Sequence, residues 1–351
     1  MGNSIPSMNP DALLESLTQS EDMDGEGVAS MADVLLDPSA SLSLKADLLR
    51  ALAAKGETAA EIAAFVRAFL VHALRPPLDL ESLDRPVIDV CGTGGDKLNL
   101  FNVSTASMFL LAASGVAVVK HGNRGITSQS GGADVLEALG IRINLPPDRY
   151  AECIRREGAA FMLAPQYHPA FASVAPVRKL LAAEGTRTIF NIIGPLLNPL
   201  QPPFQLAGVF DPALPPTYAG ILQALGRTSA WAVHGTTADG RGMDEVSTLG
   251  PTRIVRATPS TITDETITLP GPPATIEELQ GGDATKNAGI LIALLEGTDR
   301  GPKRHLILAN ASAALQVAGL AQTWDEGLAL AAEALDSGRA LAVLRGLQRF
   351  A

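Results

Sequence analysis

The chain has 351 residues, and that length exceeds what one hydrophobic core usually fills, so we expect two domains. A formal net charge of -10 argues against a nucleic-acid-binding protein, because such proteins normally present a basic surface. The two cysteines, Cys91 and Cys153, have no CxxC partner, so neither a disulfide framework nor a zinc site is expected.

The first residues carry no targeting signal. Residues 1–25 are polar and acidic, without the basic start and apolar centre of a signal peptide. No charge-free run of about 18 apolar residues follows, so no membrane-spanning helix is expected. We therefore expect a cytoplasmic protein that makes no membrane contact.

Residues 41–75 predict two helices. Leucines recur at helical spacing at Leu44, Leu48 and Leu52. Gly56 ends that pattern, and Thr58-Ala59-Ala60-Glu61 then has the form of a capping box that opens the next helix. We expect a small all-helical N-terminal domain that extends to residue 86.

From residue 87 onward, short apolar runs alternate with helical patterns. The expected strands are residues 87–91, 116–120, 141–143, 161–163, 206–210 and 230–234. The expected helices are residues 104–114, 133–139, 176–182, 286–295, 306–318 and 325–335. This alternation predicts a large α/β domain with a mostly parallel central sheet flanked by helices.

A polar, Gly-rich loop follows the first of these strands. It contains Gly92-Thr93-Gly94-Gly95-Asp96 and then Asn102-Val103-Ser104-Thr105. Glycine lets backbone N–H groups approach a phosphate, and the following helix adds the positive end of its dipole. A tight strand–helix connection would explain the glycines equally well. Ser104 and Thr105 suit helix N-caps and also ligands of a phosphate or a magnesium ion, and the two roles are compatible.

A second such loop follows the next strand. It contains Lys120-His121-Gly122-Asn123-Arg124 and then Ser128-Gln129-Ser130-Gly131-Gly132. Donor side chains clustered beside a Gly-rich turn favour an anion site, and in an acidic chain this loop concentrates positive charge. Because adjacent parallel strands end at the same edge of a sheet, we expect the two loops to form one site.

Two further features allow alternative interpretations. The adjacent carboxylates of Asp244 and Glu245 suit Mg²⁺, but a solvated acidic pair would look the same. Arg178 is either a surface residue or the forked partner of a ligand carboxylate. No GxSxG or HExxH motif is present, and the five histidines show no metal-ligand spacing.

Taken in order, these motifs closely resemble the anthranilate phosphoribosyltransferase family of the tryptophan pathway. They are GTGGD, NVST, KHGNR with SGGADVLEALG, PVR, RTIFN with GPL and NP, and GMDE, and they cover nearly the whole chain. The resemblance implies a helical domain of residues 1–86, joined by a returning segment near 176–198. It also implies an α/β domain of residues 87–175 and 199–351 that binds the phosphoribosyl group.

The same resemblance implies a reaction and its partners. The family moves the phosphoribosyl group of phosphoribosyl pyrophosphate (PRPP) onto the amine of anthranilate and releases pyrophosphate. Two Mg²⁺ ions bound with PRPP are the implied cofactors. The implied partners are these two small molecules and a second copy of the chain, in a homodimer joined through the helical domain.

Three sets of site residues follow from the positions that match the family, and no residue is assigned as a catalytic acid or base. PRPP would be bound by Gly92, Thr93, Gly94, Gly95, Asp96, Asn102, Ser104, Thr105, Lys120, Ser128 and Gly132. Anthranilate would be bound by Gly92, His121, Asn123, Arg178 and Gly194. Mg²⁺ would be bound by Ser104, Asp244 and Glu245.

The chain departs from the family's pattern at a few places that bear on substrate fit. The segment between Arg178 and Arg187 is longer than the common form. Leu100 stands where relatives often carry Thr, and Gly132 where they often carry Ser. Each of these two replacements removes a hydroxyl group that would otherwise be available to PRPP.

Two rival functions are compatible with the same fold or family. A pyrimidine nucleoside phosphorylase would use phosphate and a nucleoside, but Asn123 and Arg178 suit a carboxylated amine better than a neutral base. A non-catalytic relative would bind nucleic acid without turnover. The acidic net charge and the carboxylates of Asp244 and Glu245 argue against that second alternative.

Overall fold

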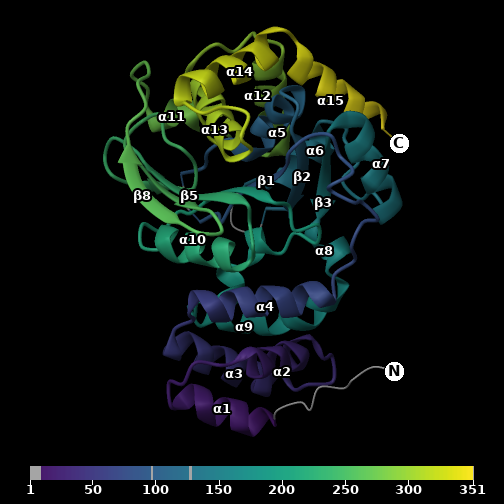
Figure 1. Cartoon of the computed structure of the whole chain (residues 1–351), viewed down its shortest axis with the longest axis vertical. Helices are drawn as coiled ribbons and strands as arrows, with labels where there is room; N and C mark the ends of the chain where they lie inside the picture. Colours follow the sequence, from purple (N-terminus) through teal and green to yellow (C-terminus); the bar gives the residue numbers. More distant parts are fainter. Residues whose placement is uncertain (1–8, 96–97, 126–128, 351) are drawn as a thin grey trace.

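A computed structural model describes residues 9–95, 98–125 and 129–350 of the chain. Figure 1 shows a group of N-terminal helices at one end of the molecule and a sheet with its covering helices at the other. None of the helices in these ranges is long and apolar enough to cross a membrane.

Four helices form the N-terminal group. They are α1 (Pro10–Thr18), α2 (Gly25–Leu36), α3 (Leu42–Lys55) and α4 (Ala59–Val71). Leu48 and Leu52 are buried on α3, and Gly56 ends that helix with a φ of 87°. The capping box predicted at the start of α4 is confirmed, because the side chains of Thr58 and Glu61 each accept a bond from the other's backbone N–H.

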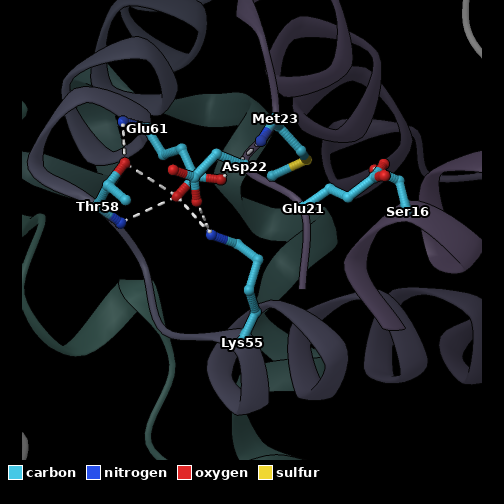
Figure 2. Close-up of polar contacts among 7 residues, drawn as sticks. All are labelled: Ser16, Glu21, Asp22, Met23, Lys55, Thr58 and Glu61. Carbon is cyan, nitrogen blue, oxygen red and sulfur yellow. Dashed lines mark hydrogen bonds and ion pairs between the residues drawn. The ribbon is translucent and has the colours of Figure 1, made fainter. Parts of the chain in front are cut away.

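A buried ion pair fastens these helices together (Figure 2). The Glu61 carboxylate lies 2.8 Å from Lys55 Nζ, and the two side chains are 1% and 3% exposed. The same carboxylate accepts bonds from the backbone N–H groups of Met23 and Thr58 at 3.0 and 2.9 Å. One side chain therefore joins the end of α3, the start of α4 and the segment that leads into α2.

The sheet contains eight strands within the described residues. They are β1 (Val87–Gly92), β2 (Ala117–Gly122), β3 (Ala159–Leu163), β4 (Phe204–Gly208), β5 (Ser229–Thr236), β6 (Gly242–Met243), β7 (Thr252–Ala257) and β8 (Ile262–Ile267). The order is β3-β2-β1-β4-β5-β7-β8, with β6 paired to β5. The first five strands in this order run parallel, whereas β6, β7 and β8 pair antiparallel. The predicted mostly parallel sheet is confirmed.

Helices cover both faces of the sheet. On one face lie α5 (Val103–Ala113), α12 (Ala284–Leu295), α13 (Pro302–Val317), α14 (Trp324–Asp336) and α15 (Arg339–Arg349) (Figure 1). On the other face, α10 (Pro215–Ala224) packs on β5 and β7 and also contacts α4, so it separates the sheet from the N-terminal helices. The remaining helices are α6 (Gly132–Ala138), α7 (Pro147–Glu157), α8 (Ala164–Tyr167), α9 (Ala175–Ala183) and α11 (Ile276–Leu279).

The segment after β3 returns to the N-terminal helices. It contains α9 and three 3-10 turns, η1 (Pro169–Val174), η2 (Ile189–Asn191) and η3 (Gly194–Leu196). Lys45 Nζ donates to the Ser173 carbonyl at 3.2 Å, and Ser173 Oγ donates to the Leu35 carbonyl at 3.1 Å. Farther along, Arg50 on α3 pairs with Glu184 at 2.8 Å. The exact boundaries of the two expected domains stay a prediction.

The strand expected at residues 141–143 is absent from the sheet, so that prediction is wrong. Ile141 and Ile143 are buried and Arg142 is exposed, which explains the misleading alternation. The carbonyl of nearby Leu145 accepts bonds from Gln166 Nε2 and the Tyr167 hydroxyl, at 2.9 and 2.8 Å. The Ile141 N–H donates to the Leu136 carbonyl at 2.9 Å, so these backbone groups at the two ends of the segment find partners without a neighbouring strand.

Candidate functional site

The carboxyl ends of the parallel strands open into a cavity of about 810 Å³. Its lining includes thirteen of the residues expected in the site: Gly92, Thr93, Gly94, Gly95, Asn102, Ser104, Thr105, Lys120, His121, Asn123, Gly132, Asp244 and Glu245. Both Gly-rich loops and the acidic pair therefore meet in one place, although they come from segments far apart in the sequence. Open α/β sheets bind their ligands at this edge.

Four of the expected residues are not among the described residues that line the cavity. Arg178 and Gly194 are not part of the cavity lining. The backbone of Gly194 nevertheless bonds to His121, and His121 does line the cavity. Asp96 and Ser128 lie outside the described residues. Their expected contacts with PRPP stay predictions.

The first Gly-rich loop presents backbone donors to an anionic group. The N–H of Gly94 donates to Asp244 Oδ2 at 2.7 Å. A Cβ added at Gly92 would lie 2.2 Å from that same oxygen, so only glycine permits the approach. Gly94 and Gly95 have φ values of 70° and 97°, which favour glycine. The loop therefore does more than connect a strand to a helix, because Gly94 brings an amide donor against a carboxylate and Gly92 leaves room for that carboxylate.

The acidic segment crosses the ends of two further strands at backbone distance. A Cβ at Gly208, the last residue of β4, would lie 1.6 Å from the Asp244 carbonyl oxygen. A Cβ at Gly235 on β5 would lie 2.4 Å from the Glu245 carbonyl oxygen. Sequence analysis did not single out these two glycines, because their role depends on a segment that is distant along the chain.

The helix after the first loop begins at Val103, one residue before the expected start. Asn102 is its N-cap residue but makes no side-chain capping bond. Ser104 and Thr105 therefore lie in the first turn of α5, and their interpretation as N-caps is wrong. Ser104 Oγ instead accepts a bond from Lys120 Nζ at 3.1 Å.

The side chain of Asn102 connects the two loops to α12. Its Nδ2 donates to the Ser130 carbonyl at 3.2 Å, and its Oδ1 accepts from Asn287 Nδ2 at 2.8 Å. Asn287 is 2% exposed and was not expected in the site. The geometry of one loop is therefore tied to that of the other.

Buried charge lies directly beneath the cavity. Burial raises the pKa of Asp89 to about 6, although the nearby Lys120 ammonium opposes that rise. Asp89 accepts bonds from the His121 N–H at 3.3 Å and from Asn198 Nδ2 at 2.9 Å. Burial also lowers the pKa of Lys120, whose Nζ donates to the Val90 carbonyl. The Lys120 ammonium thus reaches the cavity from a fixed position.

His121 does not supply positive charge, contrary to expectation. Burial, together with the nearby His168, lowers the pKa of His121 to about 3, so the ring is neutral near pH 7. The two rings meet edge to face, with centroids 5.3 Å apart. His121 Nε2 is buried and has no hydrogen-bond partner among the described residues. The residue lines the cavity, and its neutral ring suits a polar ligand group better than a phosphate.

Arg124 is also less available than expected. Its guanidinium pairs with Asp134 at 3.1 Å and with Glu137 at 2.7 Å, both on α6. The other oxygen of Asp134 accepts bonds from the N–H groups of Gly125 and Gly131, at 2.8 and 2.9 Å. Asp134 therefore holds Arg124, Gly125 and Gly131 together, and these residues flank the second loop on both sides. Both Lys120 and Arg124 line the cavity, but the Arg124 guanidinium is held by two carboxylates, whereas Lys120 Nζ bonds to a carbonyl and a hydroxyl.

Two arginines belong to the returning segment. Arg178 is exposed on α9, and its guanidinium lies 5.5 Å from the centre of the Phe190 ring. Arg187 lines the cavity and pairs with Asp211 at 3.7 Å, an arrangement that sequence analysis did not identify. Asp211 follows the carboxyl end of β4, so the strand-end rule that located the two loops would have located it too.

The donor set at the acidic pair fits a hard cation. The carboxylates of Asp244 and Glu245 and the hydroxyl of Ser104 line the same cavity, and all are oxygen donors. No cluster of three or more His, Cys, Asp or Glu side chains suited to a metal occurs in the part of the chain that the structure describes. Mg²⁺ does not need such a cluster, because it usually binds one or two carboxylates together with substrate phosphates. The residues present therefore fit Mg²⁺ that arrives with a phosphorylated ligand.

Comparisons with known proteins agree with this geometry. Residues 84–341 match the family model described as "Glycosyl transferase family, a/b domain". The anthranilate phosphoribosyltransferase of Moorella thermoacetica is 43% identical over 325 residues, which cover 91% of each chain. That of Desulfatibacillum aliphaticivorans is 40% identical over 343 residues, covering 96% of this chain and 97% of the relative.

Solved structures extend the similarity to three dimensions. The crystal structure of anthranilate phosphoribosyltransferase from Thermus thermophilus is 36% identical, with a TM-score of 0.87 over 96% of this chain and 98% of that one. The Saccharomyces cerevisiae enzyme in complex with PRPP and Mg is 25% identical, with a TM-score of 0.85 over 97% of each chain. On sequence and structure together, the chain belongs to the anthranilate phosphoribosyltransferase family.

Proposed function

We propose that this chain transfers the phosphoribosyl group of PRPP to the amine of anthranilate, a step of tryptophan biosynthesis. The products are N-(5-phosphoribosyl)anthranilate and pyrophosphate. The observation that carries the proposal is the meeting of two Gly-rich loops and an acidic pair at one cavity. The family relatives, 39–43% identical over most of their length, carry the name of this activity.

PRPP would lie across the two loops. Its phosphates would meet the N–H groups of the first loop, the start of α5 and the ammonium of Lys120, all of which favour negative charge. The Gly94 N–H that now donates to Asp244 is already oriented toward an anion. Gly92, Thr93, Gly95, Asn102, Thr105 and Gly132 would complete this surface. Asp96 and Ser128 are retained as PRPP-binding residues from the sequence.

Mg²⁺ would bind with PRPP, and two ions are proposed. Ser104 would hold one ion, and Asp244 and Glu245 the other. When bound, Mg²⁺ neutralises the negative charge that grows on pyrophosphate as it leaves the ribose. The Gly94 N–H donates to Asp244 Oδ2 and would help to hold that carboxylate beside the first loop.

Anthranilate would lie beside Asn123 and the neutral ring of His121, on the Gly92 and Gly194 side of the cavity. Arg178 would receive its carboxylate in a forked geometry, since the guanidinium is stacked on Phe190 and has no carboxylate partner among the described residues. An aromatic amine is already a nucleophile. The chain's task is therefore to hold it in line with the ribose carbon, and no strong base is required.

Two properties of the protein in solution are also proposed. Exposed apolar side chains at Leu42, Val71 and Leu74, in or just after the N-terminal helices, suit a homodimer joined through that part of the chain. A cytoplasmic location, expected from the sequence, stays a prediction.

Product identification separates this function from its rivals. The purified protein is incubated with Mg²⁺, PRPP and anthranilate, and in parallel with phosphate and either thymidine or uridine. Mass spectrometry is expected to find phosphoribosyl anthranilate in the first reaction and no free base in the second. Release of thymine or uracil without any use of PRPP would instead identify a nucleoside phosphorylase.

A further inference from the structure

Asn310 on α13 lies behind the acidic pair and was absent from the expected site. Its side chain is 2% exposed. Its Oδ1 accepts the backbone N–H of Val246 at 2.8 Å, and its Nδ2 donates to the backbone carbonyl of Val246 at 3.0 Å. Nδ2 also donates to the Leu306 carbonyl one turn back on its own helix, at 2.9 Å. The amide thus satisfies both backbone groups of one residue, as a neighbouring strand would.

Val246 follows Glu245 directly and belongs to no strand. The residue after it, Ser247, is also fixed. Its Oγ donates to the Thr236 carbonyl at 2.6 Å and accepts the Leu249 N–H at 3.0 Å. The acidic segment is therefore held by Asn310 on one side and by the end of β5 on the other.

Asn310 also lies close to the groups proposed to hold the metal. Together with Ser104 and Glu245 it lines a cavity of about 10 Å³, which has room for about one water molecule. The three bonds described above all join the Asn310 amide to backbone groups. Its influence on the acidic pair therefore passes through the backbone of Val246.

We propose that Asn310 is a positioning residue that fixes the backbone behind Asp244 and Glu245, so that their carboxylates can bind a divalent cation together with PRPP. This inference rests on the proposed function. The physical reason is that Mg²⁺ demands near-ideal geometry from its ligands and tolerates little movement in them. Residues that orient metal ligands typically change metal affinity by about 10- to 100-fold when they are replaced.

The test measures PRPP binding by calorimetry, with saturating Mg²⁺ and with EDTA, so that it does not depend on turnover. The variants are Asn310→Leu, which removes all three bonds and keeps the branched shape and the number of side-chain heavy atoms, and Asn310→Asp, which keeps the acceptor for Val246 N–H. Ser312→Ala is the matched control. Ser312 is buried on the same helix and donates to the Trp324 carbonyl, away from the acidic pair.

We expect Mg²⁺ to strengthen PRPP binding in the unaltered protein, and Asn310→Leu to reduce that enhancement by about 10-fold or more. PRPP binding in EDTA should be unchanged, and Ser312→Ala should behave as the unaltered protein. If the Asn310→Leu variant does not fold, Asn310→Asp replaces it, and the same reduction in the enhancement of PRPP binding by Mg²⁺ is expected.

The inference would be overturned if Mg²⁺ strengthened PRPP binding equally in the unaltered protein and in both Asn310 variants. It would also be overturned if the Asn310 variants lost as much PRPP affinity in EDTA as they lose with Mg²⁺. The proposed function fails separately, if PRPP binds with Mg²⁺ but anthranilate is not consumed.

Discussion

Three basic residues lie at or just after the carboxyl end of β2, and the structure places each in a different electrostatic environment. His121 is buried beside His168 and stays neutral near pH 7. Arg124 is paired with two carboxylates of α6. Lys120 brings its ammonium to the cavity while it is also bonded to Ser104. Counting basic residues in the sequence overestimates the positive charge of the site, because burial and pairing decide which of them act on a ligand.

Asp89 gives the protein a specific pH dependence. Its pKa is raised by burial from 3.8 to about 6, so between these values the folded state holds a proton that the unfolded state has lost. The stability that this group contributes is present below about pH 4 and is lost as the pH rises through about 6, by about 3 kcal/mol.

This dependence can be isolated with Asp89→Asn, because the substitution removes one titrating group and leaves the others. Urea unfolding of both proteins between about pH 4 and about pH 7 gives the free energy of unfolding at each pH. The unaltered protein should lose about 3 kcal/mol relative to the variant as the pH rises. Parallel pH profiles would show that Asp89 does not titrate in this range.

Arg178 is predicted to bind the carboxylate of anthranilate. Arg178→Ala should raise the KM for anthranilate by about 10- to 100-fold, the range expected for loss of hydrogen bonds to a charged group, while the KM for PRPP stays constant. Arg187→Ala is the control, because Arg187 lines the cavity but is paired with Asp211. If Arg187→Ala raises the KM for anthranilate more than Arg178→Ala does, Arg187 and not Arg178 binds the carboxylate of anthranilate.

At the scale of helices and strands, the buried pair of Glu61 and Lys55 holds the N-terminal helices together (Figure 2). Glu61→Ala would leave the buried Lys55 ammonium with the exposed carboxylate of Asp22, at 2.7 Å, and would leave two backbone N–H groups without their acceptor. Because Asp22 still compensates the Lys55 charge, we expect a loss of about 3 kcal/mol in the free energy of unfolding, at the low end of the range for breaking a buried pair. Thr58→Ala removes a helix cap but leaves the ion pair and should cost about 1 kcal/mol. Equal losses in urea unfolding would contradict the special role of the pair.

Gly208 at the end of β4 is predicted to be essential to the acidic segment. A Cβ there would lie 1.6 Å from the Asp244 carbonyl, so Gly208→Ala must displace the segment. A shift of about 1 Å in catalytic groups can cost about 100-fold in rate, and we expect a loss of that size. Gly220→Ala on α10 is the control, since its Cβ would make an ordinary contact of 3.6 Å. Turnover and circular dichroism separate loss of activity from loss of fold.

The sequence predicted the parallel strands best. Buried parallel strands are nearly continuous apolar runs, and β1, β2 and β3 were located to within about two residues. The strand β8 was not predicted, because its residues are mostly exposed and carry no apolar alternation. The helix α7 was not predicted either, since charged residues surround its buried stripe of Tyr150, Cys153 and Ile154.

The residues of the candidate site also fall into two groups, those that the sequence could predict and those that only the folded structure shows. Residues in contiguous motifs, such as Gly94 and Lys120, could be proposed from the sequence because their chemistry is local. Gly208, Asn287 and Asn310 could not, because each acts on a segment that is far away along the chain and close only in the folded protein.

At the scale of the whole molecule, an acidic chain forms a site for a highly charged anion by collecting backbone donors at one edge of its sheet. The cavity is lined from one side by both Gly-rich loops and from the other by Ala53 and Glu57 of the N-terminal helices and their connection. The site therefore depends on how the helices pack against the sheet, and not on either part alone.

The most direct measurement is the fluorescence of anthranilate during incubation with the protein and PRPP, with and without Mg²⁺. We predict a loss of signal that requires the protein, PRPP and Mg²⁺ together, because the amine must attack a ribose whose leaving group is neutralised. An unchanged signal from a folded protein that binds PRPP would contradict the account and would assign the phosphoribosyl group to a different acceptor.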